Sequence, residues 1–154
     1  MQSKKPRHRF IHLLGAAQRH LQQWMTQQQL AAAEAEGHAM PTPAQAAALF
    51  VLAQADGCTM GEMARALDLE PPAMSGLVQR TEALGWVLRQ PCPDDGRTQR
   101  VWLTPEGLAL LPALRRVTQG LQGRLTEGFT AEELDTVARW LDHVRRLDVT
   151  SPHG

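Results

Sequence analysis

A single predicted β-hairpin interrupts a chain whose other segments carry helical patterns. Two β-prone runs, at residues 86–89 and 100–103, flank a segment rich in proline and aspartate. On both sides of this hairpin, apolar residues recur at spacings of three and four, which is typical of amphipathic helices. The sequence therefore predicts a mainly α-helical fold (α+β) with one hairpin.

Three capping boxes mark helix starts. In each box, a threonine and a glutamine or glutamate three residues later bond each other's free backbone N–H groups. The boxes begin at Thr42, Thr59 and Thr130. With the apolar spacing, they predict helices over about residues 10–36, 43–55, 60–67, 71–84, 105–125 and 131–144. We expect Pro112 to kink the fifth helix, because proline lacks the amide donor.

Size and composition fit one ordinary domain. The chain has 154 residues, 43% hydrophobic and 21% charged, so neither a disordered nor a fibrous protein fits. The longest apolar run, residues 46–53, is far shorter than the roughly 20 residues that cross a bilayer. The N-terminus resembles a signal peptide, but His12 interrupts its apolar stretch. We therefore expect a cytoplasmic protein without a membrane partner.

The overall charge does not point to a nucleic-acid partner. Sixteen lysines and arginines balance sixteen aspartates and glutamates, so any basic surface must be local. One candidate for phosphate contacts is the N-terminal arm, which carries Lys4, Lys5, Arg7 and Arg9. The alternative for this arm is a solvated chain end.

The sequence gives little support for an enzyme or for a cofactor-binding protein. Cys58 and Cys92 are too few and too far apart for a disulfide framework or a cysteine-rich zinc site. The sequence contains no nucleophile–base motif, phosphate loop or metal triad, and no tyrosine that could act as an acid. We therefore expect a protein that is not an enzyme and holds no cofactor.

The order of elements before the hairpin predicts a helix-turn-helix followed by a β wing. If Met74, Leu77 and Val78 pack inward, together with Leu84, helical spacing leaves a small and polar outward side that could approach base edges closely. This outward side consists of Pro72, Ala73, Ser75, Gly76, Gln79 and Arg80.

These segments resemble the MarR family of bacterial winged helix-turn-helix transcription regulators. Residues 95–107 (DGRTQRVWLTPEG) are similar to the family's wing signature, an Asp-x-Arg at the tip followed by Leu-Thr-x-x-Gly. Residues 63–67 and 74–80 match the pattern of its paired helices. The resemblance extends over about residues 8–147.

The resemblance implies a single MarR-type domain over residues 1–154. Residues 43–104 would form the winged helix-turn-helix, and residues 8–36 and 105–147 would form dimerisation helices. Such a homodimer presents two winged modules to successive major grooves of a pseudo-palindromic operator in double-stranded DNA. The implied function is that of a repressor released by a small aromatic or phenolic ligand.

The resemblance also assigns DNA contacts residue by residue. Arg97 matches the wing arginine that enters the minor groove, and Asp95 matches the acid that holds it. Arg80 matches a position that meets the DNA backbone or pairs with the wing acid. The full set of predicted DNA contacts is Pro72, Ala73, Ser75, Gly76, Gln79, Arg80, Asp95, Arg97 and Arg100.

Some features depart from the family pattern. Gly76 stands where a longer polar or basic side chain is common, Thr81 where leucine is usual, and Asp68 where glycine is usual. Residues 60–104 hold five arginines and six acidic residues, which is poor for phosphate attraction. A winged-helix module that binds another protein instead of DNA is therefore an open alternative.

The predicted effector site would place an anion against an aromatic wall. Its candidate residues are His12, His20, Trp24 and Arg115. The alternative is that Trp24 belongs to the core and that the histidines are surface residues.

Thiol and metal sensing are further alternatives. We expect Cys58 to be an inert structural thiol; the alternative is a modest thiolate bias, because Cys58 lies near a helix N-terminus. Cys92 lies between two prolines on the wing. A metal-responsive regulator would rest on His8 and His12, which are one helical turn apart and lack a third nearby histidine or cysteine.

Overall fold

The structure, a computed structural model, describes residues 9–147. These fall into two compact units that divide after Val117. Lys4, Lys5 and Arg7 of the basic arm, and His8 of the candidate metal pair, lie outside the described residues. Within the described part, no helix is long and apolar enough to span a membrane.

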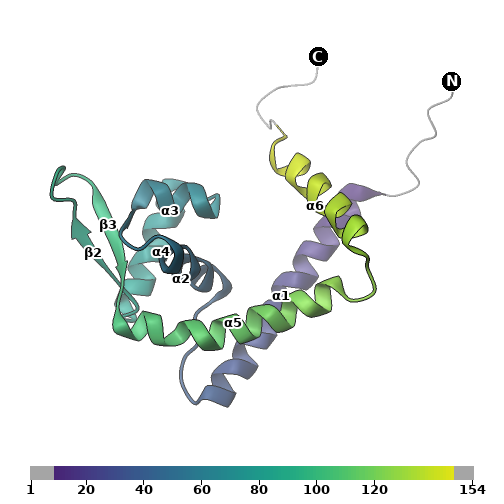
Figure 1. Cartoon of the computed structure of the whole chain (residues 1–154), viewed down its shortest axis with the longest axis horizontal. Coiled ribbons are helices and arrows are strands. Elements are labelled where there is room, and N and C mark those ends of the chain that lie inside the picture. The colour runs from purple at the N-terminus through teal and green to yellow at the C-terminus, as the bar shows by residue number, and fades with distance from the viewer. Residues whose placement is uncertain (1–8, 148–154) are drawn as a thin grey trace. The chain divides into compact units, whose positions relative to one another are not determined.

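All six predicted helices and the hairpin are present (Figure 1). The helices are α1 (Phe10–Glu36), α2 (Pro43–Gln54), α3 (Met60–Leu67), α4 (Pro71–Ala83), α5 (Pro105–Thr126) and α6 (Ala131–Arg145). All three predicted capping boxes form, at Thr42, Thr59 and Thr130. Helix α5 runs on through Pro112.

The hairpin belongs to a three-stranded antiparallel sheet. Its strands are β1 (Cys58–Thr59), β2 (Val87–Pro91) and β3 (Gln99–Leu103), in the order β1-β3-β2. The two-residue strand β1 was not predicted, because it is too short to carry a strand pattern. The hairpin also reaches further than expected, since Pro91 pairs with Gln99. Proline is tolerated there because β2 is an edge strand.

The core lies among α2, α3, α4, the sheet and the first half of α5. Its most deeply buried side chains include Leu49, Leu52, Met63, Met74 and Val101. On α5, the buried residues are Gly107, Leu110, Leu111 and Leu114.

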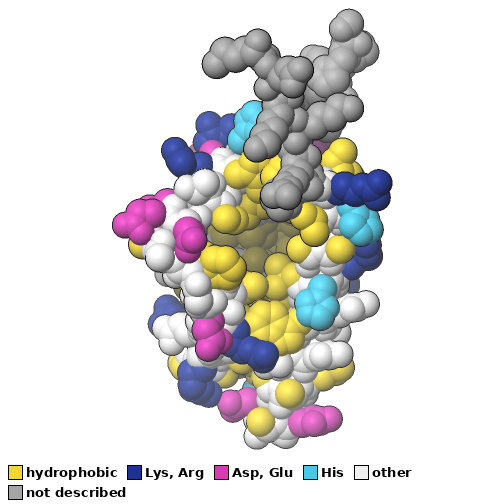
Figure 2. Space-filling view, turned by 90° about the vertical axis from the view of Figure 1, so that its right-hand side faces the viewer, with side chains coloured by type: hydrophobic (Ala, Val, Ile, Leu, Met, Phe, Trp, Pro, Cys, Tyr) yellow, Lys and Arg dark blue, Asp and Glu magenta, His cyan; other side chains and the backbone are white. Residues whose placement is uncertain are grey.

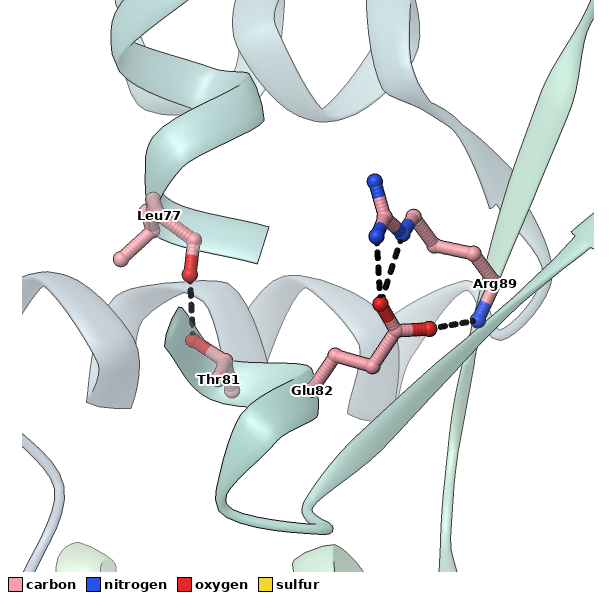
Figure 3. Close-up of polar contacts among 4 residues, drawn as sticks. All are labelled: Leu77, Thr81, Glu82 and Arg89. Carbon is pink, nitrogen blue, oxygen red and sulfur yellow. Dashed lines mark hydrogen bonds and ion pairs between the residues drawn. The ribbon is translucent and has the colours of Figure 1, made fainter. Parts of the chain in front are cut away.

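One prediction for the inward side of α4 is wrong. Leu84 follows the end of the helix and is 49% exposed, whereas Thr81 is buried in the core. A buried hydroxyl needs a partner. Thr81 Oγ1 donates to the Leu77 carbonyl at 2.7 Å (Figure 3), so a polar residue is accommodated where the family usually has leucine.

The long terminal helices contrast with this core. Neither α1 nor α6 contains a fully buried residue. Helix α6 carries an apolar stripe, formed by Leu134, Val137, Leu141 and Val144, that is half-buried to exposed. Uncovered hydrophobic side chains are plain on the surface in Figure 2.

Candidate nucleic-acid interface

The turn between α3 and α4 is made by an aspartate in a left-handed conformation. Asp68 has φ 54° and ψ 46°, and it is the only non-glycine residue with positive φ among residues 9–147. Aspartate tolerates this region better than most residues. The N–H of Leu69 donates to the Ala64 carbonyl at 2.9 Å, which closes α3 and redirects the chain into α4.

The predicted outward side of α4 is at the surface. Pro72, Ala73, Ser75, Gln79 and Arg80 are exposed, and Gly76 is half-exposed. On the opposite side, the buried residues of the helix are Met74, Leu77, Val78 and Thr81. Helix α4 therefore presents a surface with only two long side chains, which suits close approach to a groove.

The end of α4 is tied to the wing by a glutamate–arginine pair (Figure 3). Arg89 donates to Glu82 Oε2 from Nη2 at 2.6 Å and from Nε at 2.8 Å, and its backbone N–H donates to Oε1 at 3.0 Å. These bonds lower the pKa of the Glu82 carboxyl. The contact orients the sheet against the helix.

Asp95 organises the tip of the wing. Its Oδ1 accepts from the backbone N–H of Arg97 at 3.0 Å, and its Oδ2 accepts from the Thr98 hydroxyl at 3.0 Å. Asp95 thus holds Arg97 through the backbone, while the Arg97 side chain is exposed at the tip. An exposed guanidinium on an ordered turn is suited to a narrow groove of negative potential.

Arg100, one of the predicted DNA contacts, forms its hydrogen bonds within the protein. Its Nη1 donates to the Gly57 carbonyl at 2.8 Å, next to β1. Its guanidinium also bonds the Cys92 thiol, which raises the pKa of Arg100. Arg100 therefore links the wing to the segment before α3.

The two cysteines have opposite environments. The hydrogen bond from Arg100 lowers the pKa of the Cys92 thiol, with further hydrogen bonds from the backbone of Asp94 and Asp95. Burial raises the pKa of Cys58, helped by the nearby carboxylate of Glu62. This environment favours the inert thiol expected for Cys58 over the alternative of a thiolate bias, because desolvation and acidic neighbours outweigh the helix N-terminus.

The Leu-Thr-x-x-Gly motif joins the wing to α5. The Thr104 hydroxyl donates to the Gly85 carbonyl at 2.6 Å and accepts from the Gly107 N–H at 3.0 Å. A Cβ at position 107 would overlap the Trp86 carbonyl oxygen, so only glycine fits without a shift. The motif is thus explained by packing at the base of the wing.

The candidate effector residues lie on two helices. His12 and His20 are exposed on α1, Trp24 is half-buried on the same helix, and Arg115 is exposed on α5. His12 lines a shallow depression together with Arg9, Phe10 and Ile11. The lining of this depression includes none of the other three candidates. Across residues 9–147, no three histidine, cysteine or acidic side chains are placed to hold a metal ion.

Comparison with known proteins connects this geometry to a family. The MarR family model matches residues 41–98. MarR, the multiple antibiotic resistance protein of Salmonella typhimurium, is 35% identical over 83 residues, which cover 53% of this chain and 58% of that protein. The matched segment thus spans less than two thirds of this relative.

Two solved structures extend the likeness beyond the central segment. A mutant MarR from E. coli, complexed with operator DNA, is 27% identical and has a TM-score of 0.69, covering 88% of this chain and 91% of that one. The transcriptional repressor CouR, bound to a 23-mer DNA duplex, is 25% identical and has a TM-score of 0.70, covering 94% of this chain and all (100%) of that one.

The sequence comparisons and the structure comparisons both confirm the predicted resemblance to the MarR family. MarR-family members are transcription regulators, and the similar structures are not those of enzymes. The central segment is therefore a MarR-family domain, and the chain has the winged helix-turn-helix fold of the MarR-family transcription regulators.

Proposed function

We propose that this chain is a homodimeric transcription regulator that binds a specific operator in double-stranded DNA. The observation that carries the proposal is the presence, within one compact unit, of two exposed features that are suited to DNA. Helix α4 exposes a small, polar outward side, and the wing exposes Arg97 on a turn held by Asp95. A helix can enter the major groove of duplex DNA, and an exposed arginine can enter its minor groove.

The relatives support DNA as the ligand. Both the E. coli MarR mutant and CouR were solved on duplex DNA, and the present chain shares their fold at 25–27% identity. CouR is described as a repressor, which supports repression as the mode of action here. Such a regulator works on chromosomal DNA, in line with the expected cytoplasmic location.

Dimerisation is supported by uncovered apolar surface on the terminal helices. On α1, Ile11 is 93% exposed and Leu30 is 63% exposed. On the C-terminal side, Phe129, Val137 and Leu141 are exposed as well. Isolated apolar side chains need no explanation, but a series of them along long helices is typical of a surface that a partner covers. A second copy of the chain is the partner we propose.

We further propose that a small aromatic or phenolic acid regulates DNA binding. Its site would include His12, His20, Trp24 and Arg115, of which the histidines and the arginine are solvent-accessible. A titration with a hydroxybenzoate that quenches tryptophan fluorescence in the wild type, and does so less in Trp24→Phe, would support this site. Equal quenching in both proteins would reject it.

The DNA-binding proposal is tested by fluorescence anisotropy. The probe is the duplex upstream of the protein's own gene, with random duplex as competitor, over a salt series. We expect specific binding by the wild type, and its loss in Arg97→Ala. Arg19→Ala, which removes an exposed arginine from α1, is the matched control and should bind as the wild type does.

The second candidate is a protein-binding module without DNA affinity. It is favoured by the excess of one acidic residue over arginines in residues 60–104. This candidate predicts no preference of the wild type for the upstream duplex over random DNA at moderate salt. That result would reject the regulator proposal.

A further inference from the structure

Gly76 leaves a gap on the outward side of α4, and the Arg80 guanidinium lies in it. A Cβ built at position 76 would lie only 3.1 Å from Arg80 Nη1. The long side chain therefore leans back along the helix by one turn. Helical side chains point toward the N-terminus, which favours this pose, and Arg19 lies over Gly15 in the same way on α1.

This pose moves the positive charge to the middle of the recognition helix. Residue 80 lies near the C-terminal end of α4, whereas recognition helices contact base edges mainly through their N-terminal residues. Leaning back one turn shifts the guanidinium by about 5.4 Å along the helix axis. The neighbouring outward residues Ala73 and Ser75 are short, so the guanidinium is the longest group at this place.

The Arg80 side chain is also available for a ligand. Within residues 9–147 it forms no hydrogen bond or ion pair. The nearest acidic residue in the sequence, Glu82, is bound by Arg89. Arg100, in contrast, donates to the Gly57 carbonyl and bonds the Cys92 thiol.

We propose that Arg80 reads one guanine in the major groove of each operator half-site, and that Gly76 determines this specificity by leaving room for the guanidinium. A guanidinium bonds the O6 and N7 atoms of guanine in a bidentate manner, and a shift toward the helix centre places it over bases instead of phosphates. The inference rests on the proposed DNA binding. It differs from both roles that the family resemblance implies for this position, a contact with the DNA backbone or a pair with the wing acid.

The test is selection of binding sites from a random duplex library by the wild type, Arg80→Ala, Gly76→Ala and Arg19→Ala. We expect the wild type to select one guanine per half-site with a preference of about tenfold or more over other bases. In Arg80→Ala this preference should disappear, while the preferences at other positions remain. Arg19→Ala is the matched control, because Arg19 lies over Gly15 on α1 in the same pose and belongs to no predicted DNA contact, and it should keep the guanine.

Gly76→Ala tests the role of the gap. Alanine favours the helix more than glycine does, so this variant should fold. Its methyl group moves the guanidinium by a small distance, and we expect a smaller but measurable loss of the guanine preference at the same position. An unchanged preference in Gly76→Ala would overturn the role of Gly76.

The other outcomes are equally decisive. If Arg80→Ala weakens binding by the same factor on every duplex and makes the salt dependence shallower, Arg80 contacts phosphate and the inference is wrong. An unaltered selected site would also reject it. If the wild type selects no sequence at all, the proposed function itself fails, and the inference fails with it.

Discussion

The winged part and the terminal helices differ in how far a single chain covers their apolar surface. In the winged part, Leu49, Leu52 and Met63 are fully buried. Helices α1 and α6 contain no fully buried residue, although both carry large apolar side chains. The winged part therefore buries its apolar core within a single chain. The terminal helices leave apolar side chains exposed, and a partner could cover them.

The largest expected effect is in the core of the winged part. Leu52→Ala removes a side chain with no exposed surface, and we expect it to lower the free energy of unfolding by about 2–5 kcal/mol. Urea denaturation at a fixed protein concentration measures this loss. Leu108→Ala is the matched control, because Leu108 is 51% exposed on α5. Equal losses in both variants would contradict the assignment of the core.

The second prediction concerns the terminal helices. Val137→Glu places a charge on the apolar stripe of α6, and we expect the dimer dissociation constant to rise about tenfold or more, because the charge would be buried on association. Sedimentation velocity over a range of protein concentrations measures this constant for the proposed dimer. Ala131→Glu, in the first turn of the same helix, should leave it unchanged. A dimer unaffected by Val137→Glu would place the interface elsewhere.

A smaller effect is expected at the contact between α4 and the wing. The folded-state pKa of Glu82 lies below its ordinary value of 4.5, so its contribution to stability is present above that pH and is lost as the pH falls through the folded pKa. Glu82→Gln should therefore lower the free energy of unfolding by about 0.5–1 kcal/mol at neutral pH and by less in acid.

Denaturation of wild type and Glu82→Gln at pH 7 and pH 3 measures this difference. Glu132→Gln on α6 is the control for removing one exposed carboxylate. A difference between wild type and Glu82→Gln that does not shrink in acid would show that the charge of Glu82 is not what stabilises the contact.

The smallest effect distinguishes the two buried thiols. Cys92, bonded by Arg100, should react with iodoacetamide at lower pH than Cys58, because its thiolate is stabilised. Cys58→Ser and Cys92→Ser isolate each thiol for a pH–rate profile. The two residues are similarly buried, at 9% and 8% exposure, so access does not explain the difference. A lower apparent pKa for Cys58 would contradict the contacts around both thiols.

Most of the fold could be predicted because its local signals are strong. Capping boxes at Thr42, Thr59 and Thr130 placed three helix starts correctly. Strand β1 could not be predicted, since two residues carry no periodicity. The exposure of Leu84 could not be predicted from helical spacing either, because Leu84 lies beyond the last turn of α4.

The candidate site was predictable in outline but not in its internal bonds. Spacing alone placed the small, polar side of α4 at the surface. It could not show that Arg100 bonds the Gly57 carbonyl, because that contact joins residues 43 positions apart. Nor could spacing distinguish Arg80 from Arg100. Only the folded structure shows that Arg100 is bonded within the protein, whereas Arg80 forms no hydrogen bond or ion pair within residues 9–147.

The most direct test of the account is a hydroxyl-radical footprint of the wild-type protein on the duplex upstream of its own gene. A dimer with one recognition helix in each of two successive major grooves predicts two protected patches whose centres lie about one helical turn, roughly 34 Å, apart. A single patch, or protection that is uniform along the duplex, would contradict a dimeric, sequence-specific regulator.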